Sequence, residues 1–210
     1  MTSPPLLLLT MAAALLAAAA LLSLVPGRWQ ALVRASRWSL TLGALASAVA
    51  GAWLIQAGQV IRWSISGTLP GITWSLQLDP LAGFFLLVIS LPTVAASVYA
   101  GGYFTGTAHA AEGRSFVSLT ALFVLSLLGV VLANDVYSFF FAWELMALLS
   151  FLLVLIDRHQ EQRGRAGFVY LVMTHGGAAF VLLGLLLLGA HTGSLSFSAF
   201  RTLGPGLDPG

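Results

Sequence analysis

Glu144 is the residue best placed to do chemistry, because it lies deep within a long apolar stretch. That stretch covers about residues 135–156, which puts Glu144 close to the middle of a membrane-length helix. An acidic side chain at that depth costs about 2.5–3.5 kcal/mol to insert. A carboxyl group that exchanges between neutral and charged forms there is what a proton relay needs. The alternative is a protonated glutamate that bonds neighbouring helices together.

His175 is the second candidate for proton transfer. It lies about two turns into the sixth apolar stretch, counted from the N-terminal end of that stretch, which the orientation below places inside. Free histidine titrates near pH 6.5, so the ring can relay protons if it faces Glu144 through water. The alternative is a neutral histidine bonded to a carbonyl or hydroxyl of another helix. A single histidine without a second ligand is a poor metal site.

Two aspartates, Asp135 and Asp79, occupy positions near helix ends. Asp135 lies in the first turn of the fifth stretch, where it can cap the helix and favour its dipole. A role for Asp135 in external proton exchange is the alternative. Asp79 stands just before the third stretch.

No motif for catalysis or cofactor binding is present. The sequence lacks a phosphate loop, a nucleotide-binding glycine pattern, a catalytic triad and a metal-ligand cluster. It has no cysteine, which excludes disulfides and cysteine-ligated iron–sulfur clusters. We therefore expect a non-catalytic chain with no cofactor of its own; metal centres, if the protein works beside redox chemistry, belong to other subunits.

The composition requires a bilayer as solvent. The 210 residues are 59% hydrophobic and 8% charged, whereas soluble domains carry about 25% charged residues. Six stretches are long enough to cross a membrane as helices, which predicts an all-α integral membrane protein. They are 5–25, 38–58, 81–104, 115–133, 135–156 and 168–190.

The chain divides into four parts. Residues 1–58 hold two transmembrane helices, 80–190 hold four more, and 191–210 form an extended external tail. The fourth part, residues 59–79, lies between the second and third helices. It alternates apolar and polar residues on both sides of a Gly/Pro turn, which predicts an external β-hairpin. Small residues at Gly43, Ser47 and Gly51, and again over 176–179, predict close helix packing.

The arginines predict the orientation. Only Arg62 and Arg201 lie on one side, and the first, third and fifth loops hold the other seven: Arg28, Arg34, Arg37, Arg114, Arg158, Arg163 and Arg165. Because positive charge gathers on the cytoplasmic side, both termini are expected to be external in the cell (inner) membrane. The net positive charge does not indicate nucleic-acid binding, since these arginines lie between apolar stretches.

Residues 134–146, Asn-Asp-Val-Tyr-Ser-Phe-Phe-Phe-Ala-Trp-Glu-Leu-Met, resemble the fifth transmembrane helix of the antiporter-like proton-translocating membrane subunits. Residues 78–85, Leu-Asp-Pro-Leu-Ala-Gly-Phe-Phe, resemble the entry to that family's third helix. The family includes antiporter-like subunits of respiratory complex I, Mrp-type cation/proton antiporters and membrane subunits of group 4 hydrogenases. Within it the sequence most resembles the hydrogenase-4 component B subfamily, which belongs to formate-hydrogenlyase-like complexes.

The resemblance covers roughly residues 60–190 and implies that Glu144 matches an essential glutamate. In the family this glutamate pairs with a lysine on the seventh helix, within about fourteen helices and two inverted five-helix repeats. Here the sequence stops after a sixth helix and contains no lysine. The match thus corresponds to the N-terminal part of such a subunit: a fragment, a truncated product or a split subunit.

Three functions follow as hypotheses. The first is part of a proton-translocating subunit in a redox-driven complex of the hydrogenase-4 or NADH-quinone oxidoreductase type. Its expected partners are the lipid bilayer, other membrane subunits and a peripheral hydrogenase or dehydrogenase on the cytoplasmic side. The second is an Mrp-type cation/proton antiporter subunit, and the third is a non-conducting membrane scaffold.

Overall fold

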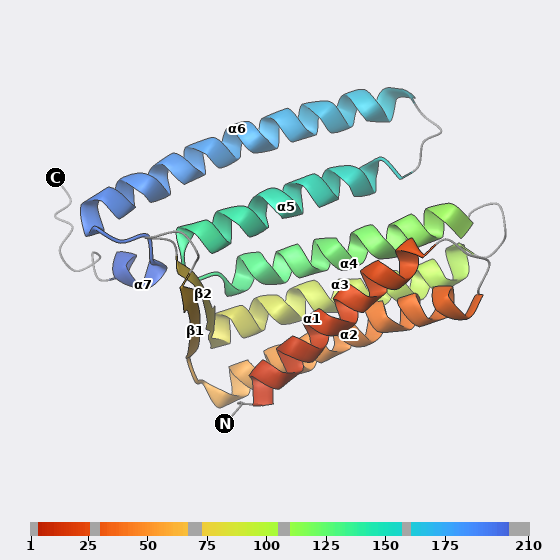
Figure 1. The fold of residues 1–210 in the computed structure, drawn as a ribbon, viewed down its shortest axis with the longest axis horizontal. Helices are drawn as coiled ribbons and strands as arrows, with labels where there is room; N and C mark the ends of the chain where they lie inside the picture. The colour runs from red at the N-terminus through yellow and green to blue at the C-terminus, as the bar shows by residue number, and fades with distance from the viewer. Residues whose placement is uncertain (1–3, 26–29, 67–72, 105–109, 157–160, 202–210) are drawn as a thin grey trace.

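Six long helices form most of the structure, a computed structural model that describes residues 4–25, 30–66, 73–104, 110–156 and 161–201. Each is long and apolar enough to cross a membrane, which confirms the predicted fold class (Figure 1). An even number of crossings puts the start of the first helix and the end of the sixth on the same side. The helices are α1 (Pro4–Leu24), α2 (Gln30–Ala57), α3 (Pro80–Tyr103), α4 (Ala110–Leu132), α5 (Val136–Val154) and α6 (Glu161–Thr192).

Helix α2 begins eight residues before the predicted start at 38, and so takes in Arg34 and Arg37. Arg37 donates from Nη1 to the carbonyl oxygen of Gly101 in the last turn of α3, at 3.0 Å. Carbonyl groups in a last helical turn have no partner within their helix, so the guanidinium satisfies one of them. Long basic side chains can extend along an apolar helix towards its polar end, which a count of apolar residues does not detect.

The helices pack side by side, and α1 lies across α2 and α4 (Figure 1). Helix α1 contacts α2 and α4, α2 contacts α3, α4 contacts α5, and α5 contacts α6 (Figure 1). The predicted close packing of α2 is confirmed, since Gly43 lies against Leu16 of α1 and Gly51 against Gly83 of α3. The same prediction for 176–179 is not met within the described residues at Gly176 and Gly177. A Cβ on either would have no described atom within 4 Å.

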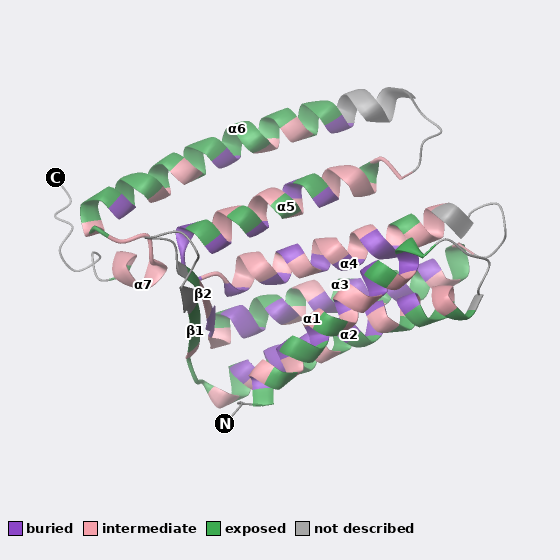
Figure 2. Cartoon of the chain, viewed as in Figure 1, coloured by how far each residue is buried: buried purple, intermediate pink, exposed green. Residues whose placement is uncertain are grey.

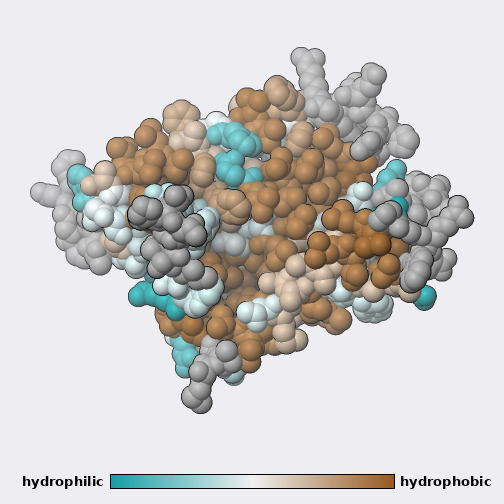
Figure 3. Space-filling model, viewed as in Figure 1, coloured by the Kyte–Doolittle hydropathy of each residue, from teal (hydrophilic) through white to brown (hydrophobic). Residues whose placement is uncertain are grey.

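The core lies among the first four helices and the strand beside them. Its buried side chains come from α1, α2, α3, α4 and the end of β2, and Figure 2 shows buried positions concentrated there. Helix α6 is different, because only 6% of its most apolar stretch is buried, against 28–44% for the other spans. The face drawn in Figure 3 is dominated by apolar residues, as expected of a surface that meets lipid or other membrane helices.

The predicted hairpin is present, as β1 (Ile61–Ser66) and β2 (Thr73–Leu78) in antiparallel register. Ile61 pairs with Leu78 and Trp63 with Leu76, which places alternate apolar residues on one face. Leu78 is buried in the core and Leu76 packs against it. The predicted turn over 67–71 lies outside the described residues.

A second set of strand-like contacts joins the hairpin to the ends of the later helices. Residues 133–136, between α4 and α5, lie between β2 and residues 195–197 (Figure 1). Asn134 N donates to Ser75 O at 2.9 Å, and Phe197 N donates to Asn134 O at 3.0 Å. The extended tail expected over 191–210 differs in the structure: α6 runs to Thr192, and residues 194–201 turn back onto α5 and include the short helix α7 (Phe197–Phe200). The rest of that tail, 202–210, lies outside the described residues. The pairing supplies partners for backbone groups that a helix end leaves free.

Candidate functional site

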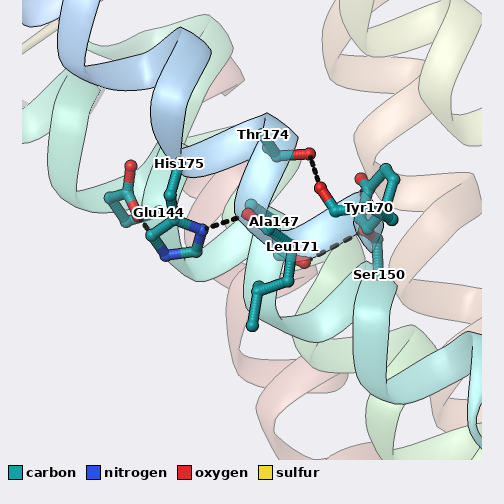
Figure 4. Close-up of polar contacts among 7 residues, drawn as sticks. All are labelled: Glu144, Ala147, Ser150, Tyr170, Leu171, Thr174 and His175. Atoms are coloured by element: carbon teal, nitrogen blue, oxygen red, sulfur yellow. Dashed lines mark hydrogen bonds and ion pairs between the residues drawn. The ribbon is translucent and has the colours of Figure 1, made fainter. Parts of the chain in front are cut away.

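Glu144 and His175 meet between α5 and α6. The Nε2 atom of His175 lies 2.9 Å from Oε2 of Glu144 (Figure 4). The Glu144 side chain is 26% exposed and that of His175 is 48% exposed, so the pair lies at the margin of the described helices. Sequence reasoning proposed that the two could face each other through water. The structure brings them into direct contact.

The imidazole ring is also held by its own helix. The Nδ1 atom of His175 lies 2.9 Å from the carbonyl oxygen of Leu171, one turn earlier in α6 (Figure 4). A carbonyl oxygen has no proton to give, so Nδ1 must carry the hydrogen of this bond. The contact therefore selects the tautomer and turns Nε2 towards Glu144.

With Nδ1 protonated, the contact between Glu144 and Nε2 needs one proton. Either a neutral carboxyl group donates to a bare Nε2, or an imidazolium donates to a carboxylate. Both arrangements have zero net charge, and they differ only in which atom holds the proton. Moving that proton between Oε2 and Nε2 leaves the charge of the pair unchanged, which limits the cost in a medium of low dielectric constant.

A hydroxyl pair lies nearby on the same two helices. Ser150 Oγ of α5 is 2.7 Å from the hydroxyl of Tyr170 in α6, on the side of the pair that leads to the α5–α6 connection (Figure 4). Thr174 Oγ1 donates to the carbonyl oxygen of Tyr170 at 2.8 Å. Sequence reasoning did not single out these residues, because a spacing along one helix does not show which residue of another helix lies opposite.

Asp135 lies at the N-terminus of α5 and is 2% exposed. Its Oδ1 accepts from the backbone nitrogen of Ser138 at 2.8 Å, as an N-cap does. Its Oδ2 accepts from Ser138 Oγ at 2.6 Å, and from Ser75 N and Oγ at 2.6 and 3.0 Å. With these four donors the carboxylate joins β2 to α5.

Asp79 caps α3 in the same way. Its Oδ1 accepts from Ala82 N at 2.8 Å, and Pro80 occupies the first helical turn. Gln77 Nε2 donates to Oδ2 of Asp79 at 2.8 Å, and Arg62 Nε donates to Gln77 Oε1 at 2.9 Å. Asp79 and Asp135 therefore lie at the hairpin end of the structure, apart from Glu144 and His175.

A cavity of about 530 Å³ lies at the same end, lined by residues that include Asp135, Tyr137, Ser194 and Ser196. Its one acidic side chain already accepts four hydrogen bonds, so the cavity offers little chemistry. Among the residues that the structure describes, no three of the types His, Asp and Glu are grouped so that they could hold a metal ion.

Comparison with known sequences gives a consistent result. Residues 133–205 match the family described as NADH:quinone oxidoreductase/Mrp antiporter, TM. Hydrogenase-4 component B of Escherichia coli is 34% identical over 139 residues, which is 65% of this chain and 20% of that protein. NADH-quinone oxidoreductase subunit N of Desulforudis audaxviator is 34% identical over 171 residues, or 79% and 33%. The chain thus spans about a fifth to a third of the length of these relatives.

Solved structures share the fold. A chain of the membrane-bound sulfane sulfur reductase, an archaeal respiratory membrane complex, superposes with a TM-score of 0.72 at 20% identity, covering 98% of this chain and 41% of that one. A chain of the Mrp complex from Dietzia superposes with a TM-score of 0.73 at 24% identity, covering 99% and 22%. Both are chains of multi-subunit membrane complexes. Over residues 133–205 the chain belongs to the NADH:quinone oxidoreductase/Mrp antiporter family, and it is related to the antiporter-like membrane subunits of hydrogenase-4 and NADH-quinone oxidoreductase.

Proposed function

We propose that this chain supplies part of a proton path in a redox-driven membrane complex, with Glu144 and His175 as its proton-transfer pair. The complex is of the hydrogenase-4 or NADH-quinone oxidoreductase type, as the names of the relatives suggest. The observation that carries the proposal is the 2.9 Å contact between His175 Nε2 and Glu144 Oε2. Two titratable groups that share one proton in the middle of a span are expensive to keep unless they are used.

His175 serves as the basic partner of Glu144 in this chain. The sequence has no lysine, so a basic partner for Glu144 within these residues must be arginine or histidine. His175 is the base that Glu144 touches. Because histidine both gains and loses a proton near neutral pH, it can pass the proton on, whereas arginine keeps its charge.

The orientation that we propose places both termini outside and the α5–α6 connection inside. Arg34, Arg37 and Arg114 lie at the helix ends that face the inner side, and Arg62 lies on the hairpin at the opposite end. This distribution supports the orientation by the positive-inside tendency. Peripheral hydrogenase or dehydrogenase subunits would then dock on the inner side.

The test is proton movement in inverted membrane vesicles from the native host, followed by a pH-sensitive fluorescent dye during electron transfer. Glu144→Gln removes the exchangeable proton but keeps the shape of the side chain. We expect coupled proton movement to be lost while electron transfer and assembly persist. Glu112→Gln is the matched control, because Glu112 lies in the first turn of α4, away from the middle of its span.

Each outcome separates the hypotheses. Normal proton movement in Glu144→Gln would exclude the proposed path and favour a scaffold. Proton movement that requires sodium, with or without electron transfer, would favour an Mrp-type antiporter subunit.

A further inference from the structure

Helix α6 is held to the rest of the chain by few contacts. Within the described parts of the chain, α5 is the one long helix against which α6 packs closely, and most of the surface of α6 is exposed. The position of His175 relative to Glu144 therefore depends on how α6 is fixed along α5. An axial slide of about one residue is 1.5 Å, enough to break a hydrogen bond of ordinary length.

Two contacts between α5 and α6 lie apart from Glu144 and His175. At Gly167, a Cβ would lie 2.9 Å from Cε2 of Phe151, so the helices approach closely there. One turn further on, the Tyr170 hydroxyl meets Ser150 Oγ at 2.7 Å. The glycine permits close approach but does not define the register, because it offers no directional contact. The hydroxyl pair is directional and does define it.

The turn of α6 that begins at Tyr170 also carries the groups that orient the histidine. Leu171, the next residue, gives its carbonyl oxygen to Nδ1 of His175. Thr174, just before the histidine, donates to the carbonyl oxygen of Tyr170. Residues 170–175 thus form a connected turn, anchored to α5 at one end by Ser150 and meeting it at the other through Glu144 (Figure 4).

We infer that the Tyr170–Ser150 hydrogen bond is a positioning contact that sets the register of α6 on α5 and so holds His175 Nε2 within reach of Glu144. Neither hydroxyl touches the pair, and both act through the helix turn that bears the histidine. Hydrogen bonds between membrane helices contribute modestly to stability. Their value here is geometric, since the proton can move only while Oε2 and Nε2 remain in hydrogen-bond contact.

The direct test is nitrogen NMR of the full protein labelled with ¹⁵N-histidine. The chain has four histidines, and the resonances that disappear in His175→Gln are those of His175. The Glu144→Gln variant supplies the reference value, which is the Nε2 resonance of His175 when no carboxyl group faces it. We expect Tyr170→Phe to move the Nε2 resonance towards that value, while Nδ1, held by Leu171, keeps its protonated signal. Tyr99→Phe is the control, because Tyr99 lies exposed on α3 and stacks on Tyr103.

A second variant separates positioning from a general loss of folding. Ser150→Ala removes the other half of the contact with a smaller change, and should move the Nε2 resonance in the same direction. The double variant should shift it no further than either single variant, since all three remove the same interhelical bond and the second bond of Ser150 Oγ, to Ala147 O, lies within α5. Ser126→Ala, which removes a buried hydroxyl bonded within α4, should leave it unchanged. An unchanged Nε2 resonance in Tyr170→Phe, or additive shifts in the double variant, would overturn the inference.

The functional consequence rests on the proposed role of Glu144. Tyr170→Phe should lower coupled proton movement severalfold, and it should have no further effect in a Glu144→Gln background. If Glu144→Gln conducts normally, the proposed function fails, yet the NMR result still decides whether Tyr170 positions His175. If Glu144→Gln abolishes proton movement and Tyr170→Phe changes neither resonance nor rate, the positioning inference alone fails.

Discussion

Gly51 of α2 and Gly83 of α3 face each other with no room for a side chain on either. A Cβ on Gly51 would lie 2.6 Å from the carbonyl oxygen of Gly83, and a Cβ on Gly83 would lie 2.7 Å from that of Gly51. Backbones that come this close gain dispersion contacts, which drive helix association where lipid removes the hydrophobic effect. The contact lies beside Leu54 and Leu86, both fully buried.

Gly51→Ala should therefore destabilise the protein. The added methyl group meets backbone, which cannot rotate away, so we expect a loss of about 1–3 kcal/mol. Thermal unfolding in detergent should show a lower midpoint. Gly184→Ala is the control, because no described atom lies within 4 Å of a Cβ there, and an unchanged midpoint is expected. Equal midpoints for both variants would contradict the packing argument.

Asp135→Ala should loosen the junction between the hairpin and α5. It leaves Ser138 N and Ser75 N without their acceptor, and we expect a cost of about 1–3 kcal/mol. Asp135→Asn should cost less, because the amide oxygen still accepts at the N-cap. Limited proteolysis and thermal unfolding measure the two variants side by side. A normal Asp135→Ala protein that lost only proton movement would instead favour a role in proton exchange.

His175→Gln should abolish coupled proton movement as Glu144→Gln does. Glutamine can still bond to Glu144, but it cannot take up and release a proton near neutral pH. The fluorescence assay in inverted vesicles measures the loss. His191→Gln is the matched control, because His191 is exposed in the last turn of α6, away from Glu144. Full proton movement in His175→Gln would mean that another group serves Glu144.

The orientation can be tested directly because the chain has no cysteine. Ser64→Cys places a thiol on the exposed part of β1, and Tyr103→Cys places one at the opposite end of the helices. In intact cells a membrane-impermeant maleimide should label the first variant and not the second. In inverted vesicles the pattern should reverse. The opposite result in both preparations would place the termini inside.

The sequence determined the features that depend on local composition. Six apolar stretches predict six spans, because a bilayer sets the length of a helix that crosses it. Alternation over residues 59–79 predicts the hairpin, because successive side chains of a strand point to opposite faces. Glu144 is conspicuous for the same kind of reason, since a charge within an apolar span is unusual wherever the helix packs.

The tertiary structure decided which of these elements meet, and therefore what the site is. Periodicity shows which face of a helix a residue occupies, but the register between two helices depends on side chains such as Tyr170 and Ser150. The spacing of residues along α5 and α6 does not show that His175 contacts Glu144. It also does not show that Gly176, where close packing was expected, has no described neighbour within 4 Å of a Cβ. The contact of residues 195–197 with the start of α5 is also not predictable from the sequence. It is made by backbone groups, which every residue has, so no residue type indicates it.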